Sequence, residues 1–138
     1  MKVFLDTNIL MDIVFERNFC LNEELEIIAC AKDGLFACSV SALSIVNTIY
    51  VSKKYGLSLD NVKNTLLKLS ECVEILDVRG IDAVTMLSSS DWKDYEDSLQ
   101  YISAENFVAD FIITRNKKDY SLSSIPVYTP LEFVELHQ

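Results

Sequence analysis

The chain has 138 residues, 50% of them hydrophobic, and a formal net charge of −9. This size and composition predict one domain with its own core, spanning residues 1–138. No apolar run approaches the length of a membrane span, so we expect no membrane partner. The negative charge argues against general attraction to nucleic acid, because sequence-independent affinity comes from Lys and Arg.

The cysteines give no sign of a zinc site. Cys20, Cys30, Cys38 and Cys72 form no CxxC pair, and His137 is the only histidine. We interpret the cysteines as the reduced thiols of a cytoplasmic protein. The N-terminus begins directly with a predicted strand, so we expect no secretory signal.

Short apolar runs alternate along the chain with longer segments of helical period. The runs are nearly continuous, as in strands that are buried on both faces. The expected strands are residues 2–6, 36–40, 73–78, 111–114 and 127–129. The expected helices are residues 9–15, 22–33, 42–54, 59–71, 81–88, 95–108 and 131–136. This pattern predicts an α/β fold with three layers, α/β/α, and a mainly parallel central sheet.

Helix signals support these boundaries. Ser41 and Ser58 stand where N-caps belong, and Gly34 and Gly56 stand where helices should end.

Polar residues gather where the predicted strands end and where a late helix begins. The stretches are Asp6-Thr7-Asn8, Ser39-Val40-Ser41, Asp94 to Asp97, and Thr114-Arg115-Asn116 with Asp119. Ligands of open α/β sheets bind beyond the carboxyl ends of the strands, which favours a site here. Each stretch alone has a structural alternative, because the same residue types cap helices and close turns.

The helix predicted over 42–54 carries a mid-helix asparagine. Its spacing predicts a buried stripe of Ala42, Ile45, Val46 and Ile49, with Asn47 at the edge. Asn47 can face the same cleft as Asp6 or face solvent, and this pattern leaves both open.

The helix predicted over 95–108 begins with carboxylates. Asp97 heads a stripe with Tyr101, Ala104 and Val108, so its side chain should point inward at the helix N-terminus. Asp94 either shares that face or caps the helix.

Together these stretches predict an acidic cluster of Asp6 and Asp97 with Asp94 or Asp119. Two carboxylates about 4 Å apart repel by roughly 4 kcal/mol when partly buried, so they need a shared proton or a cation. Oxygen ligands alone favour Mg²⁺ or Mn²⁺, which can activate water for attack on a phosphodiester.

Four motifs together resemble a PIN domain, a family of small Mg²⁺-dependent nucleases that includes VapC-type toxins of bacterial toxin–antitoxin pairs. The motifs are VFLDTNILMD, SVSALS, DYEDSLQYISA and DFIITRNKKDY, in this order along the whole chain. The resemblance implies an endoribonuclease with Mg²⁺ or Mn²⁺ as cofactor and a sheet flanked by helices. It places the family's first aspartate at Asp6, supported by Asn8, and its late helical aspartate at Asp97, with Asp94 as an extra carboxylate. The hydroxyl beside the family's last acidic position falls on Thr114.

Two positions depart from the family pattern. The acidic residue usual in the middle helix is Asn47 here, and Asn116 follows the TR pair, which leaves Asp119 as the nearest carboxylate. An amide oxygen can bind a metal but adds no negative charge, so the departures predict weaker metal binding unless Asp94 and Asp119 substitute.

Basic and aromatic residues flank the expected site. Arg115, Lys117 and Lys118 either contact RNA phosphates or form an ordinary solvated turn. Among the aromatic residues, Trp92 is the better surface candidate for stacking a base, since Tyr101 lies on the predicted core stripe.

The sequence leaves other functions open. A PIN-like binding or scaffold module keeps the fold and drops catalysis, as Asn47 and Asn116 suggest. A haloacid-dehalogenase-like phosphatase and a receiver domain are further alternatives, although Asn8 stands where the phosphatase needs a second aspartate. As partners we expect RNA and a protein antitoxin. A homodimer could form through the helices predicted over 22–33 or 59–71.

Overall fold

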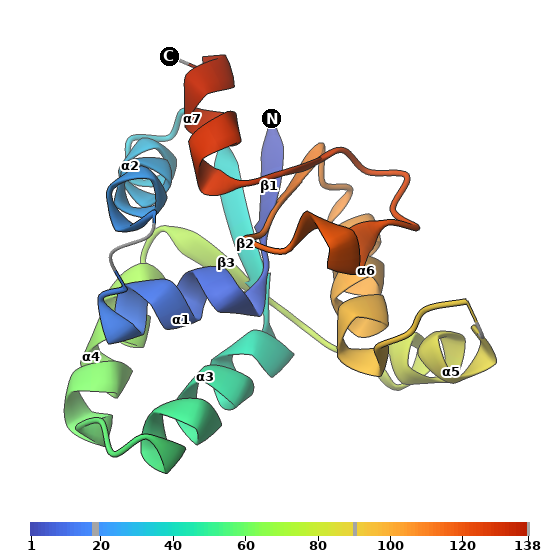
Figure 1. Ribbon diagram of the computed structural model, residues 1–138, viewed down its shortest axis with the longest axis horizontal. Helices are drawn as coiled ribbons and strands as arrows, with labels where there is room; N and C mark the ends of the chain where they lie inside the picture. Colours follow the sequence, from blue (N-terminus) through green and yellow to red (C-terminus); the bar gives the residue numbers. More distant parts are fainter. Residues whose placement is uncertain (18–19, 90, 138) are drawn as a thin grey trace.

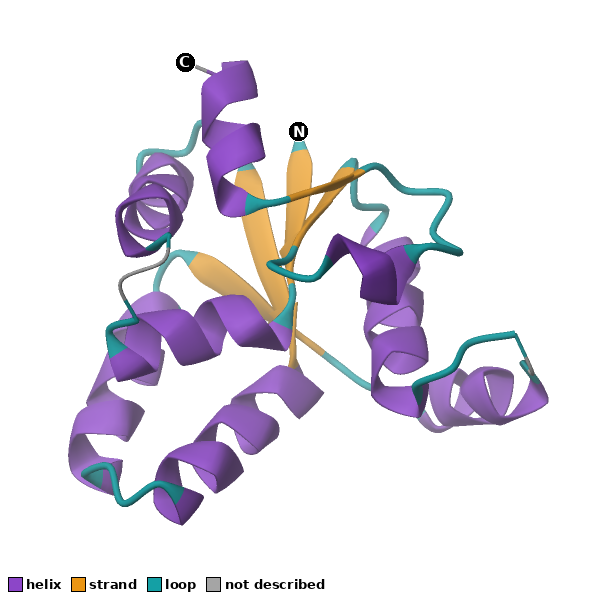
Figure 2. Cartoon of the chain, viewed as in Figure 1, coloured by secondary structure: helices purple, strands orange, loops and turns teal. Residues whose placement is uncertain are grey.

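The computed structural model describes residues 1–17, 20–89 and 91–137. Five strands form in this part of the chain: β1 (Lys2–Leu5), β2 (Ala37–Ser41), β3 (Val73–Leu76), β4 (Phe111–Ile113) and β5 (Val127–Tyr128). The α-helices are α1 (Thr7–Phe15), α2 (Leu21–Lys32), α3 (Ala42–Lys54), α4 (Leu59–Leu69), α5 (Gly80–Ser88), α6 (Tyr95–Phe107) and α7 (Pro130–His137), and η1 (Lys117–Tyr120) is a short 3₁₀ helix. Figure 2 shows the strands as a central group with helices around them.

The strands form one sheet in the order β3-β2-β1-β4-β5, and every neighbouring pair is parallel. The first strand of the chain is therefore the central one. Val3 pairs with Cys38 on one side and with Phe111 on the other. The carboxyl ends of β1, β2 and β4 consequently meet at one edge of the sheet, which confirms the predicted parallel arrangement.

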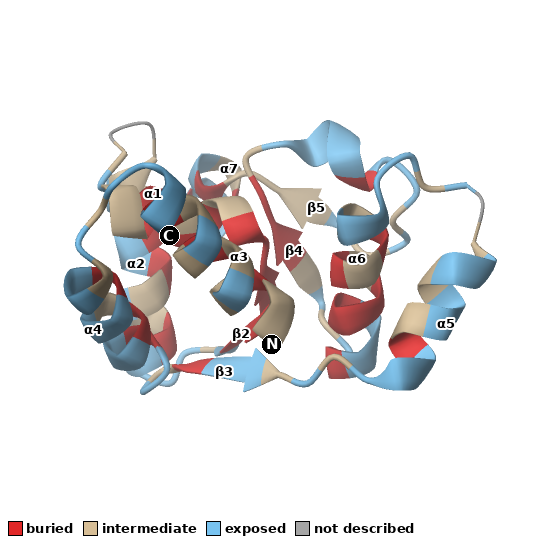
Figure 3. Ribbon diagram, turned by 90° about the horizontal axis from the view of Figure 1, so that it is seen from below, coloured by how far each residue is buried: buried red, intermediate tan, exposed pale blue. Residues whose placement is uncertain are grey.

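Side chains of β1 alternate between two cores. Val3 and Leu5 lie in the larger core, together with residues of α1, α2, α4 and α7. Phe4 points to the other face, where it packs in a smaller core with Ala104 and Tyr120. Figure 3 shows how buried residues follow the sheet and the inward faces of the helices. Apolar side chains on both faces explain why the strand sequence is continuously hydrophobic.

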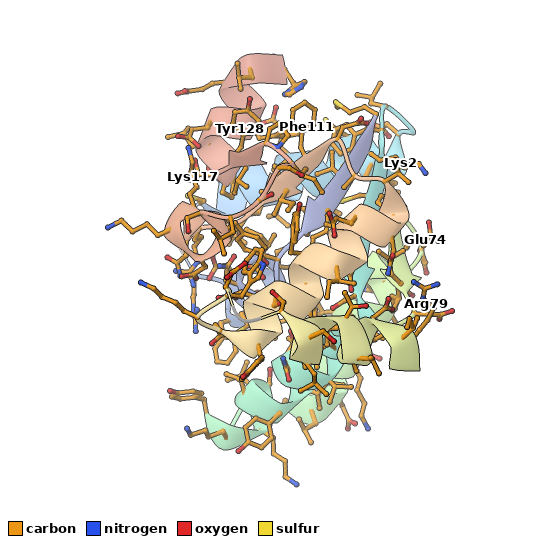
Figure 4. The ribbon with its side chains drawn as sticks, turned by 90° about the vertical axis from the view of Figure 1, so that its right-hand side faces the viewer. Lys2, Glu74, Arg79, Phe111, Lys117 and Tyr128 are labelled. Carbon is orange, nitrogen blue, oxygen red and sulfur yellow. The ribbon has the colours of Figure 1, made fainter. Side chains whose placement is uncertain are left out.

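Helices cover both faces of the sheet, which confirms the three-layer α/β/α prediction. In Figure 1, α1, α2 and α4 lie to the left of the sheet, and α5 and α6 lie to its right. At the upper end in Figure 4, the labelled rings of Phe111 and Tyr128 lie beside each other, with centroids 5.5 Å apart. No helix of the described ranges is long and apolar enough to cross a membrane. The four cysteines are free.

The expected helix caps and stops are confirmed. Ser41 Oγ accepts a hydrogen bond from the Ser44 amide at 3.2 Å, and Ser58 caps α4. Gly34 and Gly56 have φ angles of 77° and 73°, the left-handed region that glycine adopts without strain.

Several strand boundaries end earlier than expected. Asp6 and Thr114 follow their strands instead of ending them, and β3 stops at Leu76 rather than at residue 78. Asp6 is the N-cap of α1, so its backbone already serves the helix. Val108, placed on the inward stripe of its helix, is instead an exposed left-handed C-cap of α6.

The predicted buried stripe of α3 is wrong in one important respect. Val46 is 63% exposed, whereas Ser44, Thr48 and Ser52 are fully buried. The Thr48 hydroxyl donates to the Ser44 carbonyl, and the Ser52 hydroxyl donates to the Thr48 carbonyl, each at 2.7 Å. These hydroxyls are buried because each finds a backbone acceptor one turn earlier, which hydrophobic periodicity does not detect.

Candidate metal centre and nuclease site

Asp6 lies where the central strand meets the first helix, and hydrogen bonds hold both of its carboxylate oxygens. Oδ1 accepts the Thr7 amide at 2.8 Å, which makes Asp6 the N-cap of α1. Oδ2 accepts the Thr114 hydroxyl at 2.8 Å and the Asn8 side-chain amide at 3.1 Å. Asp6 is buried, and burial raises its pKa despite these hydrogen bonds. The carboxylate is therefore fixed in orientation at the bottom of the site.

Asn8 and Thr114 connect the start of α1 to the turn after β4. The Asn8 side-chain amide also donates to the Thr114 hydroxyl oxygen at 3.0 Å, while its Oδ1 accepts the Arg115 amide at 3.2 Å. The Asn116 amide donates to Thr114 Oγ1 at 3.1 Å. Asn116 thus acts here through its backbone. The predicted supporting role of Asn8 and Thr114 agrees with this network around Asp6.

A cleft of about 340 Å³ opens above Asp6. Its lining consists of Asp6, Thr7, Asn8, Met11, Asp94, Glu96, Asp97 and Asp119. The carboxylates come from three elements, namely the end of β1, the start of α6 and η1. All four residues predicted to form the acidic cluster therefore lie around one cleft.

The negative charges in this cleft act on one another. Burial, followed by the charges of Asp94, Asp119 and Asp6, raises the pKa of Asp97 to about 7. Asp94 has a second role as the N-cap of α6, since its Oδ1 accepts the Asp97 amide at 3.1 Å. Both alternatives for Asp94 therefore hold. A carboxyl that is half protonated near neutral pH marks an excess of negative charge, which a proton or cation can relieve.

Asn47 approaches this cleft through a carboxylate of α6. Its side-chain amide donates to Glu96 Oε1 at 2.9 Å, and the Thr7 hydroxyl lies 3.4 Å from the same oxygen. Asn47 therefore orients Glu96. Glu96 was missed as a site residue, although it stands directly before Asp97 in the quoted motif.

A second missed residue, Gln100, ties the elements around the cleft together. It is fully buried, and its Nε2 donates to the Thr7 and Ser44 hydroxyls, each at 2.7 Å. Its Oε1 accepts the Ser41 hydroxyl at 2.7 Å. Every polar atom of this amide is used, so Gln100 fixes α6 against α1 and α3. Gln100 lies one helical turn after Glu96, and that spacing was the available signal.

The basic residues after β4 differ in their surroundings. Arg115 Nε lies 2.6 Å from Asp12 Oδ2, so this side chain is directed into the protein. Lys117 pairs with Glu132 at 3.0 Å on the surface. Lys118 is exposed and has no ion pair within the described part of the chain. Of the three residues predicted to contact phosphate, Lys118 is therefore the most available.

The aromatic prediction needs a correction. Trp92 stacks on Tyr101 with ring centroids 5.1 Å apart and meets the edge of Tyr120. Trp92 belongs to the smaller core, so it is not a free surface ring.

The donor set fits a hard divalent cation held by few protein ligands. Only carboxylate, amide and hydroxyl oxygens and the Met11 side chain line the cleft. No group of three or more His, Cys, Asp or Glu residues within the described ranges is close enough to hold a metal by itself. Mg²⁺ commonly binds through one or two carboxylates and keeps several waters, which this arrangement allows.

Comparison with known proteins gives a consistent picture. The family model described as PIN domain matches residues 2–118. Ribonuclease VapC1 from Aquifex aeolicus (strain VF5) is 30% identical over 97% of this chain and 94% of its own length. A toxin–antitoxin complex from Klebsiella pneumoniae contains a chain of 25% identity with a TM-score of 0.62, covering 93% of this chain and 97% of that one. A chain of VapBC2 from Rickettsia felis, bound to a promoter DNA fragment, has a TM-score of 0.70 at 18% identity and covers 94% of this chain and 98% of that one.

The family match overturns the phosphatase and receiver-domain alternatives, because it spans the residues on which those alternatives depended. The order of the motifs along the chain and the convergence of their acidic residues on one cleft agree with it. The chain belongs to the PIN domain family.

Proposed function

We propose that this cleft hydrolyses RNA phosphodiester bonds with Mg²⁺ or Mn²⁺ bound at Asp6 and Asp97, and that the chain is the toxin of a toxin–antitoxin pair. The observation that carries the proposal is the convergence of five carboxylates on one cleft, where burial and then the charges of neighbouring carboxylates raise the pKa of Asp97 to about 7. A relative named as a ribonuclease supports RNA as the substrate.

Each carboxylate has a role in this proposal. Asp6 and Asp97 would hold the cation, and Asp94, Glu96 and Asp119 would surround it with further negative charge. When bound, such a cation polarises a phosphoryl oxygen and supplies a more acidic water for in-line attack. Thr114 and Asn8 keep Asp6 Oδ2 in one orientation through hydrogen bonds of 2.8 and 3.1 Å. Orientation of a ligand by its neighbours is a known determinant of metal affinity and activity.

An acidic protein needs local contacts to hold RNA. Lys118 lies on η1, the element that also carries Asp119 into the cleft. An RNA phosphate beside the cleft can therefore contact Lys118 directly. Lys117 is paired with Glu132 and contributes less.

A PIN-like binding or scaffold module remains the second candidate. One observation favours it, since no three acidic residues of the described ranges are close enough to hold a metal by themselves. Asn47 argues the other way, because its contact with Glu96 brings another carboxylate to the cleft.

A Mn²⁺ titration separates the two candidates. Melting temperature and cleavage of a mixed-sequence single-stranded RNA are followed in the same samples for wild type, Asp97→Asn and Asp60→Asn. Asp60 is an exposed aspartate in the first turn of α4, so its variant removes the same charge outside the cleft. We expect metal-dependent stabilisation and cleavage in wild type and Asp60→Asn, with both lost in Asp97→Asn. A wild-type chain without any metal response supports the scaffold candidate.

The protein partner in this proposal is an antitoxin, because two of the similar structures are toxin–antitoxin complexes. Growth arrest on expression in a bacterial host, lost in Asp97→Asn, tests the toxin role.

A homodimer is also part of the proposal. It can cover the exposed apolar side chains of Leu25 in α2 and Leu67 in α4, and light scattering measures it directly.

A further inference from the structure

Asp12 is a fully buried aspartate that the proposed chemistry does not use. It lies in α1, six residues after Asp6, and has no solvent-exposed surface. Two guanidinium groups lie close to its carboxylate. Arg115 Nε lies 2.6 Å from Oδ2, and Arg17 Nη1 lies 3.4 Å from Oδ1. The buried charge is thus paired, and the pair joins α1 to the turn after β4.

Glu24 of α2 is buried against this pair. It also has no exposed surface, and neither of its carboxylate oxygens accepts a hydrogen bond within the described part of the chain. Burial and then the charge of Asp12 raise the pKa of Glu24 to about 9. At neutral pH the carboxyl is therefore protonated and can donate to Asp12, which removes the cost of two buried like charges.

Few other groups act on Glu24. Arg115 lowers its pKa, whereas Glu23 on the same helix raises it. The Cys20 thiol lies at the start of the helix, where burial and then the charges of Glu23, Glu24 and Asp12 raise its pKa. The helix α7 also packs on α2.

Glu132 and His137 of α7 are occupied elsewhere, and Glu135 is exposed. Glu132 pairs with Lys117, and the ring Nδ1 of His137 lies 2.8 Å from the Phe133 carbonyl oxygen.

A continuous set of contacts leads from this buried cluster to the cleft. The backbone amide of Arg115 donates to Asn8 Oδ1 at 3.2 Å, and the adjacent Asn116 amide donates to Thr114 Oγ1 at 3.1 Å. Thr114 and Asn8 both donate to Asp6 Oδ2. Since the Arg115 side chain is held by Asp12, the position of this turn depends on a residue outside the cleft.

We propose that Asp12, paired with Arg115 and Arg17, is a positioning residue for the cleft. Through Arg115 it fixes the turn over residues 114–116, and this turn sets the orientation of Asp6. The inference rests on the proposed nuclease function, so its test includes a measurement that needs no catalysis.

Amide hydrogen exchange, measured by NMR without added metal, reports the turn directly. In Asp12→Asn we expect the Arg115 and Asn116 amides to exchange about 10-fold faster or more, because their acceptors are no longer held in place. In Arg115→Lys a cation remains beside Asp12, so the two amides should exchange more slowly than in Asp12→Asn but faster than in wild type. The matched control is Asp82→Asn, which breaks the Arg79–Asp82 pair (2.9 Å) of α5 and should leave both amides unchanged.

RNA cleavage with Mn²⁺ is measured on the same variants. We expect Asp12→Asn to lower kcat by about 10- to 100-fold with little change in KM, the loss typical of residues that orient metal ligands. Arg115→Lys should be intermediate, and Asp82→Asn should match wild type at a temperature where both are folded.

A Glu24→Gln variant tests the shared proton, because glutamine is neutral at every pH. The pKa of Glu24 is higher in the folded state than the ordinary value of 4.5, so its contribution to stability is complete below pH 4.5 and is lost as pH rises through about 9. The melting temperature of wild type should therefore fall relative to Glu24→Gln between pH 6 and pH 9. Equal pH profiles would show that Glu24 shares no proton with Asp12, and the positioning role would then rest on the Arg115 pair alone.

The remaining outcomes are distinct. Unchanged exchange at Arg115 and Asn116 in a folded Asp12→Asn variant overturns the positioning role. If wild type cleaves no RNA while exchange changes as expected, the proposed function fails and the coupling between the buried cluster and the turn stands. If Asp12→Asn does not fold, Arg115→Lys and Arg115→Gln carry the same comparison, and equal exchange in these two variants and wild type overturns the proposal.

Discussion

Asp82 and Asp97 are each the third residue of their helix, α5 and α6, and these helices pack together. Their carboxyl groups nevertheless titrate in opposite directions. Hydrogen bonds from Arg79 hold the pKa of Asp82 at about 2, and the Asn106 amide adds to this effect. Burial and three neighbouring aspartates raise the pKa of Asp97 to about 7.

The difference shows that position at a helix start does not decide the state of a carboxylate. The dipole at a helix N-terminus favours an anion at both residues, but it typically contributes only about 1 kcal/mol. The surroundings decide, since Asp82 pairs with the Arg79 cation, whereas burial and the charges of neighbouring aspartates act on Asp97. A cluster of uncompensated charge costs stability, and such clusters are typical of functional sites. Figure 4 places Arg79, at the compensated site, on the opposite side of the view from Lys117 of η1.

The largest expected effect comes from removing the charge of Asp6. Asp6→Asn should lower RNA cleavage by at least about 10²-fold, the loss typical for a group that stabilises transition-state charge. Asparagine also caps helices, so the bond to the Thr7 amide can remain and the melting temperature should stay near that of wild type. A large loss of stability in thermal melts would show that Asp6 is mainly structural.

Removing the charge of Asp97 should stabilise the metal-free protein at alkaline pH. Because the pKa of Asp97 is raised from 3.8 to about 7, its contribution to stability is complete below pH 3.8 and is lost as pH rises through about 7. In EDTA at pH 8, Asp97→Asn should melt on the order of 5 °C above wild type. The two proteins should converge toward pH 4. Lower stability of the variant at every pH would contradict the uncompensated state of this carboxyl.

Removing the charge of Asp82 should have the opposite sign. Asp82→Asn loses the ion pair with Arg79 and weakens the start of α5, which should cost about 1 kcal/mol of unfolding free energy. Since the pKa of Asp82 is lowered to about 2, this deficit is present above pH 3.8 and shrinks as pH falls through about 2. Urea unfolding at pH 7 and pH 3 measures this deficit in unfolding free energy at each pH. RNA cleavage should not change.

The smallest expected effect comes from the lysines of η1, where, within the described residues, Lys117 is paired with a carboxylate and Lys118 is not. Lys118→Ala should weaken RNA binding and lower the slope of log affinity against log salt by about 0.7. Lys117→Ala should change the slope less, because Lys117 already pairs with Glu132. Fluorescence anisotropy with a labelled RNA and a non-cleaving Asp97→Asn background gives both slopes. Equal slopes for the two variants would show that the pair with Glu132 does not matter.

The fold was predictable because hydrophobic runs in this chain match buried strands closely. The parallel sheet, the three layers and the seven α-helices of the described residues follow from the alternation of short apolar runs and helical periods. Asp6 and Thr114 could be predicted as neighbours because parallel strands bring their carboxyl ends to the same edge. Asp97 lies at the start of α6, and its inward stripe and the order of the motifs were the signals that joined it to them.

Buried polar side chains explain what the sequence did not reveal. Ser44 and Glu24 are fully buried, yet nothing in their spacing distinguishes them from surface residues. Gln100 is also fully buried, and its spacing from Glu96 was the only signal. Their burial depends on partners in distant elements, such as the hydroxyl of Thr7 for Gln100. The direction of the Arg115 side chain depends in the same way on Asp12 of α1. Hydrophobic periodicity measures where apolar surface lies and carries no information on such partners.

The bond between Thr114 and Asp6 joins residues 108 positions apart in the chain. The central strand β1 is made well before its neighbour β4 and the turn that holds Asp6. A growing chain on the ribosome therefore has its first aspartate long before it has a cleft. The order of synthesis itself delays assembly of the site until β4 and the turn after it have emerged.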